Sequence, residues 1–220
     1  MMTKQLKTRI FLWGMALWMT FTAQAQTLRQ ADARQQQDMV ARISRSAAAI
    51  RTLTCHFTQV KTLQFLNEQM QSEGLMAYQT DGRCLRWEYQ KPYQYTFILN
   101  GDKAHVLSAK GRQTIDIRQS RLFQGIARVM MSSVTGSGLA TGGDFTCTMY
   151  TGGGDEWQAV LTPRRKEMKK MFKDIRLHIS ASRQMVTQVE MTEQGGDVTV
   201  ITLKDVKLNG PVDQKMFADR

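Results

Sequence analysis

Short segments in which apolar and polar residues alternate, separated by turn residues, dominate the first half of this chain. Leu53, Cys55 and Phe57 alternate with polar residues, as in a strand with one dry face. Such alternation commits one face of a sheet to an apolar environment and the other to water. Because the segments are short, regularly spaced and bounded by turns such as Asn100-Gly101, they predict a curved antiparallel sheet or open barrel. The expected strands of this half are residues 52–60, 74–78, 84–89, 93–99, 104–107 and 114–117.

The second half of the chain returns to the same pattern after a glycine-rich stretch that ends near Gly143. Turns are expected at residues 152–155 and at Gly195-Gly196. The expected strands are residues 145–150, 157–161, 172–179, 185–191 and 198–208. Pro163 is followed by a segment expected to form a basic loop, with Arg164, Arg165, Lys166, Lys169 and Lys170. This loop is either a solvated turn or a contact for an anionic membrane surface or a transporter.

Two segments have helical rather than strand periodicity. From about residue 30 to residue 53, apolar residues such as Met39, Ile43, Ala47 and Ile50 fall on one face of a helix. Residues 121–134 carry a second apolar stripe, and glycines follow it. This second segment fits either a lid over the mouth of a curved sheet or an ordinary helix packed on a sheet, and periodicity does not separate the two.

The first 25 residues have the three parts of a secretory signal peptide. Lys4, Lys7 and Arg9 precede an apolar stretch over residues 10–21, and Ala23-Gln24-Ala25 supplies small residues for cleavage. We expect cleavage after Ala25, which leaves residues 26–220 as one domain. The first cysteine is Cys55, so the mature chain is not expected to be lipidated itself.

No catalytic or metal-binding motif stands out in the sequence, and neither an enzyme nor a resident cofactor is expected. Ser137 lacks the strand-turn-helix context of a hydrolase nucleophile, and the three histidines are scattered. No two cysteines stand at zinc-ligand spacing. The net charge of +11 fits nucleic acid, an anionic membrane or an acidic partner, and export makes nucleic acid the least suitable of the three.

Three cysteines lie beyond the expected signal, namely Cys55, Cys84 and Cys147. An oxidising compartment permits a disulfide, and an odd number leaves at least one thiol unpaired. Cys55 and Cys84 could pair if their strands are neighbours. Alternatively, all three are buried free thiols.

Several short motifs follow one another along the chain in a fixed order. They are residues 50–59, Gly74, Leu85-Arg86-Trp87-Glu88-Tyr89 with Pro92, Asn100-Gly101, Leu161-Thr162-Pro163, and Asn209-Gly210-Pro211-Val212-Asp213 with Phe217. This ordered set resembles the LolA family of periplasmic lipoprotein carriers, and the resemblance covers nearly the whole mature chain.

This resemblance implies a fold that is mainly β with α, in which a bent antiparallel sheet forms an unclosed barrel covered by lid helices. It implies a periplasmic carrier, expected to be a monomer without a cofactor. Such a carrier would take acylated lipoproteins from an inner-membrane ABC transporter and pass them to an outer-membrane acceptor. Two alternatives remain: a protein of this fold that binds another lipid or glycolipid in envelope biogenesis, or an envelope sensor module that transports nothing.

The resemblance and the alternation together suggest which residues line an acyl-binding cavity. Family members often carry an arginine before a proline that holds the lid shut. This chain has no proline there, and the resemblance makes Arg83, at a displaced position, the candidate substitute for that arginine. The expected cavity residues are Leu53, Phe57, Met76, Tyr78, Leu85, Trp87 and Tyr89 on the sheet, joined by Cys55, with Leu122, Phe123, Ile126, Met130 and Met131 on the lid.

Overall fold

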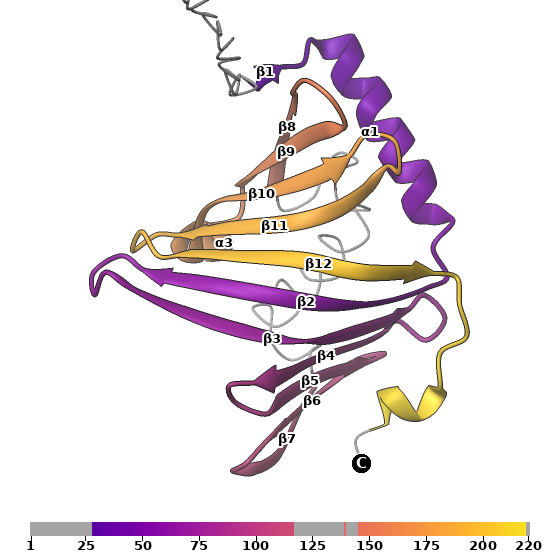
Figure 1. Ribbon diagram of the computed structural model, residues 1–220, viewed down its shortest axis with the longest axis vertical. Coiled ribbons are helices and arrows are strands. Elements are labelled where there is room, and N and C mark those ends of the chain that lie inside the picture. Colours follow the sequence, from indigo (N-terminus) through magenta and orange to yellow (C-terminus); the bar gives the residue numbers. More distant parts are fainter. Residues whose placement is uncertain (1–27, 117–138, 140–144, 219–220) are drawn as a thin grey trace, which may run out of the picture.

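The computed structural model describes residues 28–116, 139 and 145–218, and their main element is one antiparallel sheet (Figure 1). Within these residues the sheet has 12 strands in the order β1-β8-β9-β10-β11-β12-β2-β3-β4-β5-β6-β7. The edge strands β1 and β7 do not pair with each other, so the sheet is unclosed, as expected from the sequence. The strands are β1 (Arg29–Gln30), β2 (Thr52–Leu63), β3 (Glu68–Gln79), β4 (Cys84–Lys91), β5 (Tyr95–Asn100), β6 (Lys103–Ser108), β7 (Gly111–Asp116), β8 (Phe145–Thr151), β9 (Glu156–Pro163), β10 (Phe172–Ser180), β11 (Met185–Glu193) and β12 (Val198–Leu208).

The structure corrects three details of the sequence-based prediction. The hairpin of β2 and β3 runs well past residue 60, because the polar residues beyond it still pair, out to Leu63 opposite Glu68. The basic segment expected to be a loop contains the short helix α3 (Lys166–Met171). The short edge strand β1 had no pattern in the sequence.

The two faces of the sheet differ sharply in character. We call the face that carries Leu53, Phe57 and Trp87 the inner face, and the face that carries His56 and His178 the outer face. Side chains of the inner face form the main hydrophobic cluster, and most of them are buried. The outer face is largely polar over β9–β12. Alternation along each strand produces this division, because successive side chains point to opposite sides.

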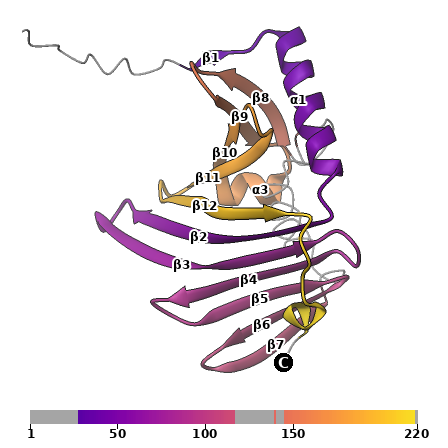
Figure 2. The ribbon, with the colours of Figure 1, turned by 45° about the vertical axis from the view of Figure 1, so that its right-hand side comes forward.

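Helix α1 (Ala33–Ala48) lies at one end of the sheet and contacts β8 and β11 (Figure 2). Asp32 begins it with a capping box, in which its carboxylate accepts from the backbone N–H of Gln35 at 2.8 Å. Its buried residues Met39 and Ile43 belong to the inner-face cluster. The guanidinium of Arg42 lies 4.9 Å from the ring centroid of Trp157, which adds a cation–π contact.

The C-terminal segment covers part of the outer face of β4 and β5. After β12 the chain forms the 3-10 helix η3 (Gln214–Phe217), whose Phe217 packs with Ala77 and Cys84 in a second, smaller cluster. Arg86 donates to the carbonyl of Met216 at 3.0 Å and fixes this segment in place. Within the described residues, η3 thus buries an apolar patch on the outer face around Ala77 and Cys84.

Gly74 permits a close approach between strands in the middle of the sheet. A Cβ at this position would overlap the carbonyl oxygen of Glu88 and lie 2.8 Å from Cζ of Phe57. We expect Gly74→Ala to lower the free energy of unfolding by about 2–3 kcal/mol, because the overlap involves backbone and a packed ring. Urea unfolding followed by circular dichroism measures this change.

Gly195 provides the matched control for that substitution. A Cβ there meets nothing within 4 Å, so Gly195→Ala should change the unfolding free energy by less than about 0.5 kcal/mol. Equal unfolding midpoints for the two variants would contradict the packing assigned to Gly74.

Candidate functional site

The sheet residues expected to line a cavity all lie on the inner face, and the strand pairing arranges them in rows. Leu53 lies opposite Tyr78, which lies opposite Leu85. One row further along β2, Cys55, Met76 and Trp87 are partners, followed by Phe57, Gly74 and Tyr89. The side chains of the other residues in these rows are buried, and Tyr89 is partly buried and packs against the same cluster. Gly74 contributes no side chain. Alternation thus assigned their face correctly.

The expected lid residues Leu122, Phe123, Ile126, Met130 and Met131 lie outside the described residues. The strands on either side of this stretch, β7 and β8, lie near opposite edges of the sheet. One residue between them is described: Leu139 is 3% exposed and belongs to the inner-face cluster.

Aromatic rings occupy the centre of the inner face. The rings of Phe57 and Trp87 are 4.6 Å apart between centroids, and those of Phe57 and Tyr89 are 5.2 Å apart in an edge-to-face arrangement. Tyr95 continues the row at 6.1 Å from Tyr89. These distances lie in the range of favourable aromatic pairs. Gly74 lies between two of these rings in its row, and its missing side chain leaves room for Phe57.

Few hydrogen-bonding groups interrupt this apolar centre. The hydroxyl of Tyr89 donates to Oε1 of Gln59 at 2.8 Å, and burial raises its pKa. The indole N–H of Trp87 lies close to the Tyr89 hydroxyl and acts to lower the pKa of that hydroxyl. This N–H is buried and makes no hydrogen bond of good geometry among the described residues. Within the described residues, the inner face therefore offers mainly apolar and aromatic contact area, a composition suited to binding rather than to acid–base chemistry.

The half of the inner face that lies on β8–β12 was not predicted from the sequence. Apolar and polar residues also alternate along these strands, but the expected cavity residues of the sheet were placed on β2–β4 because of the resemblance to the LolA family. The missed residues that are buried in the same cluster are Met149, Ala159, Leu161, Ile175, Leu177, Ile179, Val186, Val189, Ile201 and Leu203, together with Leu99 and Ala104 on β5 and β6.

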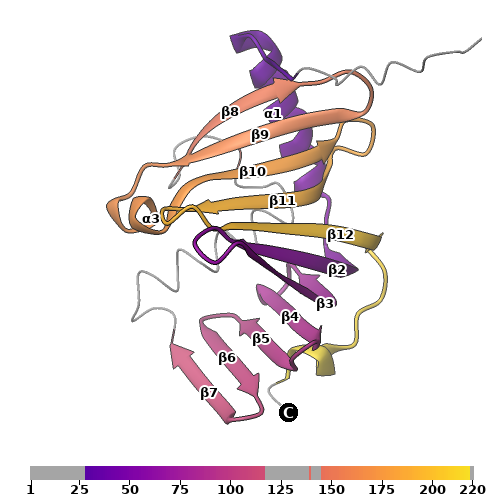
Figure 3. The same cartoon turned by 60° about the vertical axis from the view of Figure 1, so that its left-hand side comes forward.

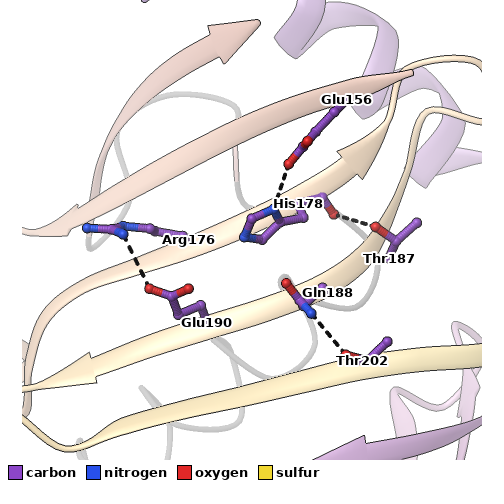
Figure 4. Close-up of polar contacts among 7 residues, drawn as sticks. All are labelled: Glu156, Arg176, His178, Thr187, Gln188, Glu190 and Thr202. Atoms are coloured by element: carbon purple, nitrogen blue, oxygen red, sulfur yellow. Dashed lines mark hydrogen bonds and ion pairs between the residues drawn. The ribbon is translucent and has the colours of Figure 1, made fainter. Parts of the chain in front are cut away.

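The outer face of β9–β12 carries paired polar side chains instead (Figure 4). Nδ1 of His178 lies 2.9 Å from Oε1 of Glu156, and Arg176 pairs with Glu190 at 3.3 Å. Gln188 donates to Thr202 at 3.0 Å. An open hollow of about 400 Å³ lies over these strands and is lined mainly by such polar groups. Most of these groups pair across neighbouring strands, while Nε2 of His178 is buried without a hydrogen-bond partner among the described residues. We assign the paired groups to keeping this face in contact with water.

Arg83, the expected substitute for the family's latch, is engaged at the periphery of the sheet. It lies in the turn between β3 and β4, and its guanidinium pairs with Asp102 in the turn between β5 and β6 at 2.7 Å. Its side chain is 69% exposed. Among the described residues, its ion pair therefore links two turns.

The strand order and the two faces of the sheet exclude a disulfide between Cys55 and Cys84. Cys55 on β2 and Cys84 on β4 are separated by β3, and they belong to clusters on opposite faces of the sheet. All three cysteines are free thiols. The pairing considered from the sequence is therefore wrong. Burial raises the pKa of Cys55 to about 12 and that of Cys147 to about 11, and it also raises the pKa of Cys84.

These thiols should be unreactive in the folded protein. A pKa of about 12 leaves roughly one Cys55 thiol in ten thousand ionised at pH 8, and only the thiolate attacks a disulfide reagent. We expect Ellman's reagent to detect fewer than one thiol per native chain within minutes, and three after unfolding without reductant. Only one thiol after unfolding would reveal a disulfide and contradict the assignment.

The described residues contain no helix that is long and apolar enough to span a membrane, and no cluster of three or more metal-ligating side chains.

Comparison with known proteins gives a consistent result. A family model described as "Outer membrane lipoprotein carrier protein LolA" matches residues 48–219. An outer-membrane lipoprotein carrier protein of Pseudoalteromonas translucida is 23% identical over 176 residues, which is 77% of each chain. That of Pseudomonas paraeruginosa is 29% identical over 168 residues, which is 76% of each chain. A solved LolA superfamily protein from Nitrosomonas europaea aligns over 83% of this chain and 97% of its own, with 12% identity and a TM-score of 0.44.

Proposed function

The chain belongs to the LolA family of outer-membrane lipoprotein carrier proteins, and we propose that its inner face binds the acyl chains of lipoproteins while they cross the periplasm. The family consists of carriers and not of enzymes. The observation that carries the proposal is the continuous apolar inner face of an unclosed sheet, which extends over both halves of the chain.

The energetics of acyl burial favour such a face over a tight cavity. Removing acyl chains from water is worth about 0.8 kcal/mol per methylene, so three chains that were fully enclosed would contribute roughly 30 kcal/mol. Non-covalent affinities saturate near about 20 kcal/mol, and a carrier must also release its cargo. An unclosed sheet can bury the chains in part, which keeps the affinity within a reversible range.

The proposed binding surface comprises the inner-face residues around the aromatic centre. The N–H of Trp87 makes no hydrogen bond of good geometry among the described residues, and it would donate to an ester carbonyl at the head of an acyl chain, since that group is an acceptor without a donor of its own. The proposed contacts are Leu53, Cys55, Phe57, Met76, Tyr78, Leu85, Trp87 and Tyr89, with Leu122, Phe123, Ile126, Met130 and Met131 completing the surface.

We place this activity in the periplasm of a Gram-negative cell. Residues 1–25 would direct export and be removed, and residues 26–220 would act as a single domain without a lipid of their own. The cargo would arrive from an inner-membrane ABC transporter and leave to an outer-membrane acceptor. The sequence similarity to carriers from two genera supports this pathway.

Release of newly made lipoproteins from spheroplasts tests the proposal. Purified mature protein, added to spheroplasts of the organism that encodes it, should bring lipoproteins into the supernatant as a soluble complex. We expect Phe97→Arg to reduce this release at least tenfold, because Phe97 is the strand partner of Trp87 and packs against the inner-face cluster.

Thr96→Arg is the matched control, because Thr96 precedes Phe97 on β5 and lies on the opposite face. This variant should release lipoproteins as the wild type does. Both variants are compared only after circular dichroism shows cooperative unfolding. The absence of release by the folded wild-type protein would refute the carrier function, and equal release by the two variants would refute the inner face as its site.

A further inference from the structure

One end of the sheet gathers several turns and the helix α3. Because consecutive strands run in opposite directions, the turns between β2 and β3, β4 and β5, and β11 and β12 all lie at this end (Figure 1). Helix α3 precedes β10 and lies beside the β11–β12 turn (Figure 3). We call this end, with Phe65, Leu66, Tyr93, Arg164 and α3, the basic end.

Hydrogen bonds join these elements into one unit. Gln194 in the β11–β12 turn donates from its backbone to the carbonyl of Met171 at 3.0 Å and from its side chain to the carbonyl of Lys169 at 2.7 Å. On the other side of the same turn, Asp197 accepts from the backbone N–H of Gln64 at 3.0 Å. Lys61 adds an ion pair with Glu193 at 2.7 Å. The turn thus links α3 to the tip of the β2–β3 hairpin.

Exposed apolar side chains concentrate at the basic end. Phe65 is 96% exposed, Leu66 is 57% exposed and Tyr93 is 72% exposed. Met70 and Tyr95, also exposed, are near the same turns, and among the described residues Leu208 is the one exposed large apolar side chain at the opposite end. A phenylalanine and a leucine held in water at the tip of a hairpin have no role in the core, so such a site indicates a contact with something apolar.

Basic side chains lie at the same end of the sheet as this apolar tip, in and just before α3. Arg164, Lys166, Lys169 and Lys170 are exposed, and none of the four forms an ion pair within the described part of the chain. The acidic residues nearby are Glu167 in α3, Glu68 beside the tip, and Glu193 and Asp197, which share Lys61. Together with Lys61, the four exposed basic residues outnumber these four carboxylates by one, so the named charges at this end are positive in sum.

We propose that the basic end docks on an anionic phospholipid surface. Phe65 and Leu66 would enter the interfacial layer, and the four cations would lie at the level of the lipid phosphates. Apolar side chains on a narrow tip with cations set beside them match a membrane interface, which is apolar at depth and anionic at its surface. A protein partner would instead require a broader complementary patch. This inference concerns a surface outside the acyl-binding face and does not depend on the cargo.

Sedimentation with lipid vesicles tests this proposal with the mature, cargo-free protein. Wild-type protein should bind vesicles that contain one-third phosphatidylglycerol and should bind pure phosphatidylcholine vesicles at least tenfold more weakly. Lys169→Gln combined with Lys170→Gln should weaken binding about 25-fold, because each basic residue near an anionic surface contributes about fivefold. Phe65→Ser combined with Leu66→Ser should weaken it about tenfold or more.

Two controls separate this surface from the others. Leu208→Ser removes an exposed apolar side chain at the opposite end and should leave vesicle binding unchanged. Uptake of lipid by the inner face would depend on Phe97 and not on headgroup charge, so Phe97→Arg should also bind anionic vesicles normally. Failure of the wild-type protein to bind anionic vesicles at low salt, as expected if the basic end docks on a protein, would overturn the proposal. Unchanged binding by the lysine or the Phe65/Leu66 variant would overturn it as well.

Discussion

The pairing of β2 with β3 fixes which face of the sheet is apolar. Its 12 residue pairs run without interruption from Thr52 opposite Gln79 to Leu63 opposite Glu68. A slip of one residue would turn Leu53 and Phe57 toward water, because side chains alternate between faces. Neighbouring strands inherit this register: β4 follows β3, and β12 follows β2 on the other side. The inner-face cluster, the aromatic centre and the polar outer face all depend on this one alignment.

An unclosed sheet of this kind carries more apolar surface than its own strands can cover. Helix α1 covers one end through Met39 and Ile43, and Leu139 adds to the cluster. The inner-face side chains of the cluster are already buried in the structure, so a bound cargo would have to replace groups that cover them. Acyl chains have the right chemistry for that exchange, because they bring apolar area and few polar groups. The large apolar area of the inner face therefore explains both the need for a cover and the choice of acyl chains as the proposed cargo.

Most of the strands could be predicted from alternation, because the inner face is buried and tolerates few polar residues. The predicted positions of Leu53, Phe57 and Trp87 on one face are confirmed for this reason. The long hairpin tip could not be predicted, since Lys61, Gln69 and their neighbours pair through the backbone without an apolar signal.

Other features depend on contacts distant in the sequence. Helix α3 has six residues, too few for a clear period, and its buried Met168 and the bonds from Gln194 support it. The thiol states of Cys55 and Cys84 required the strand order, because β3 lies between their strands and the two side chains lie on opposite faces of the sheet. The lid residues at 122–131 lie outside the described part of the chain, and their role remains a prediction from the sequence.

The identity of the native ligand tests the central claim most directly. The protein should be purified from the periplasm of its own cells without detergent, and its bound molecules should be identified by native mass spectrometry followed by peptide and lipid analysis. The account predicts lipoproteins whose N-terminal cysteine carries acyl chains, bound one per chain. Recovery of free phospholipid or glycolipid alone, or of a ligand-free protein from cells in which lipoprotein export is active, would contradict it.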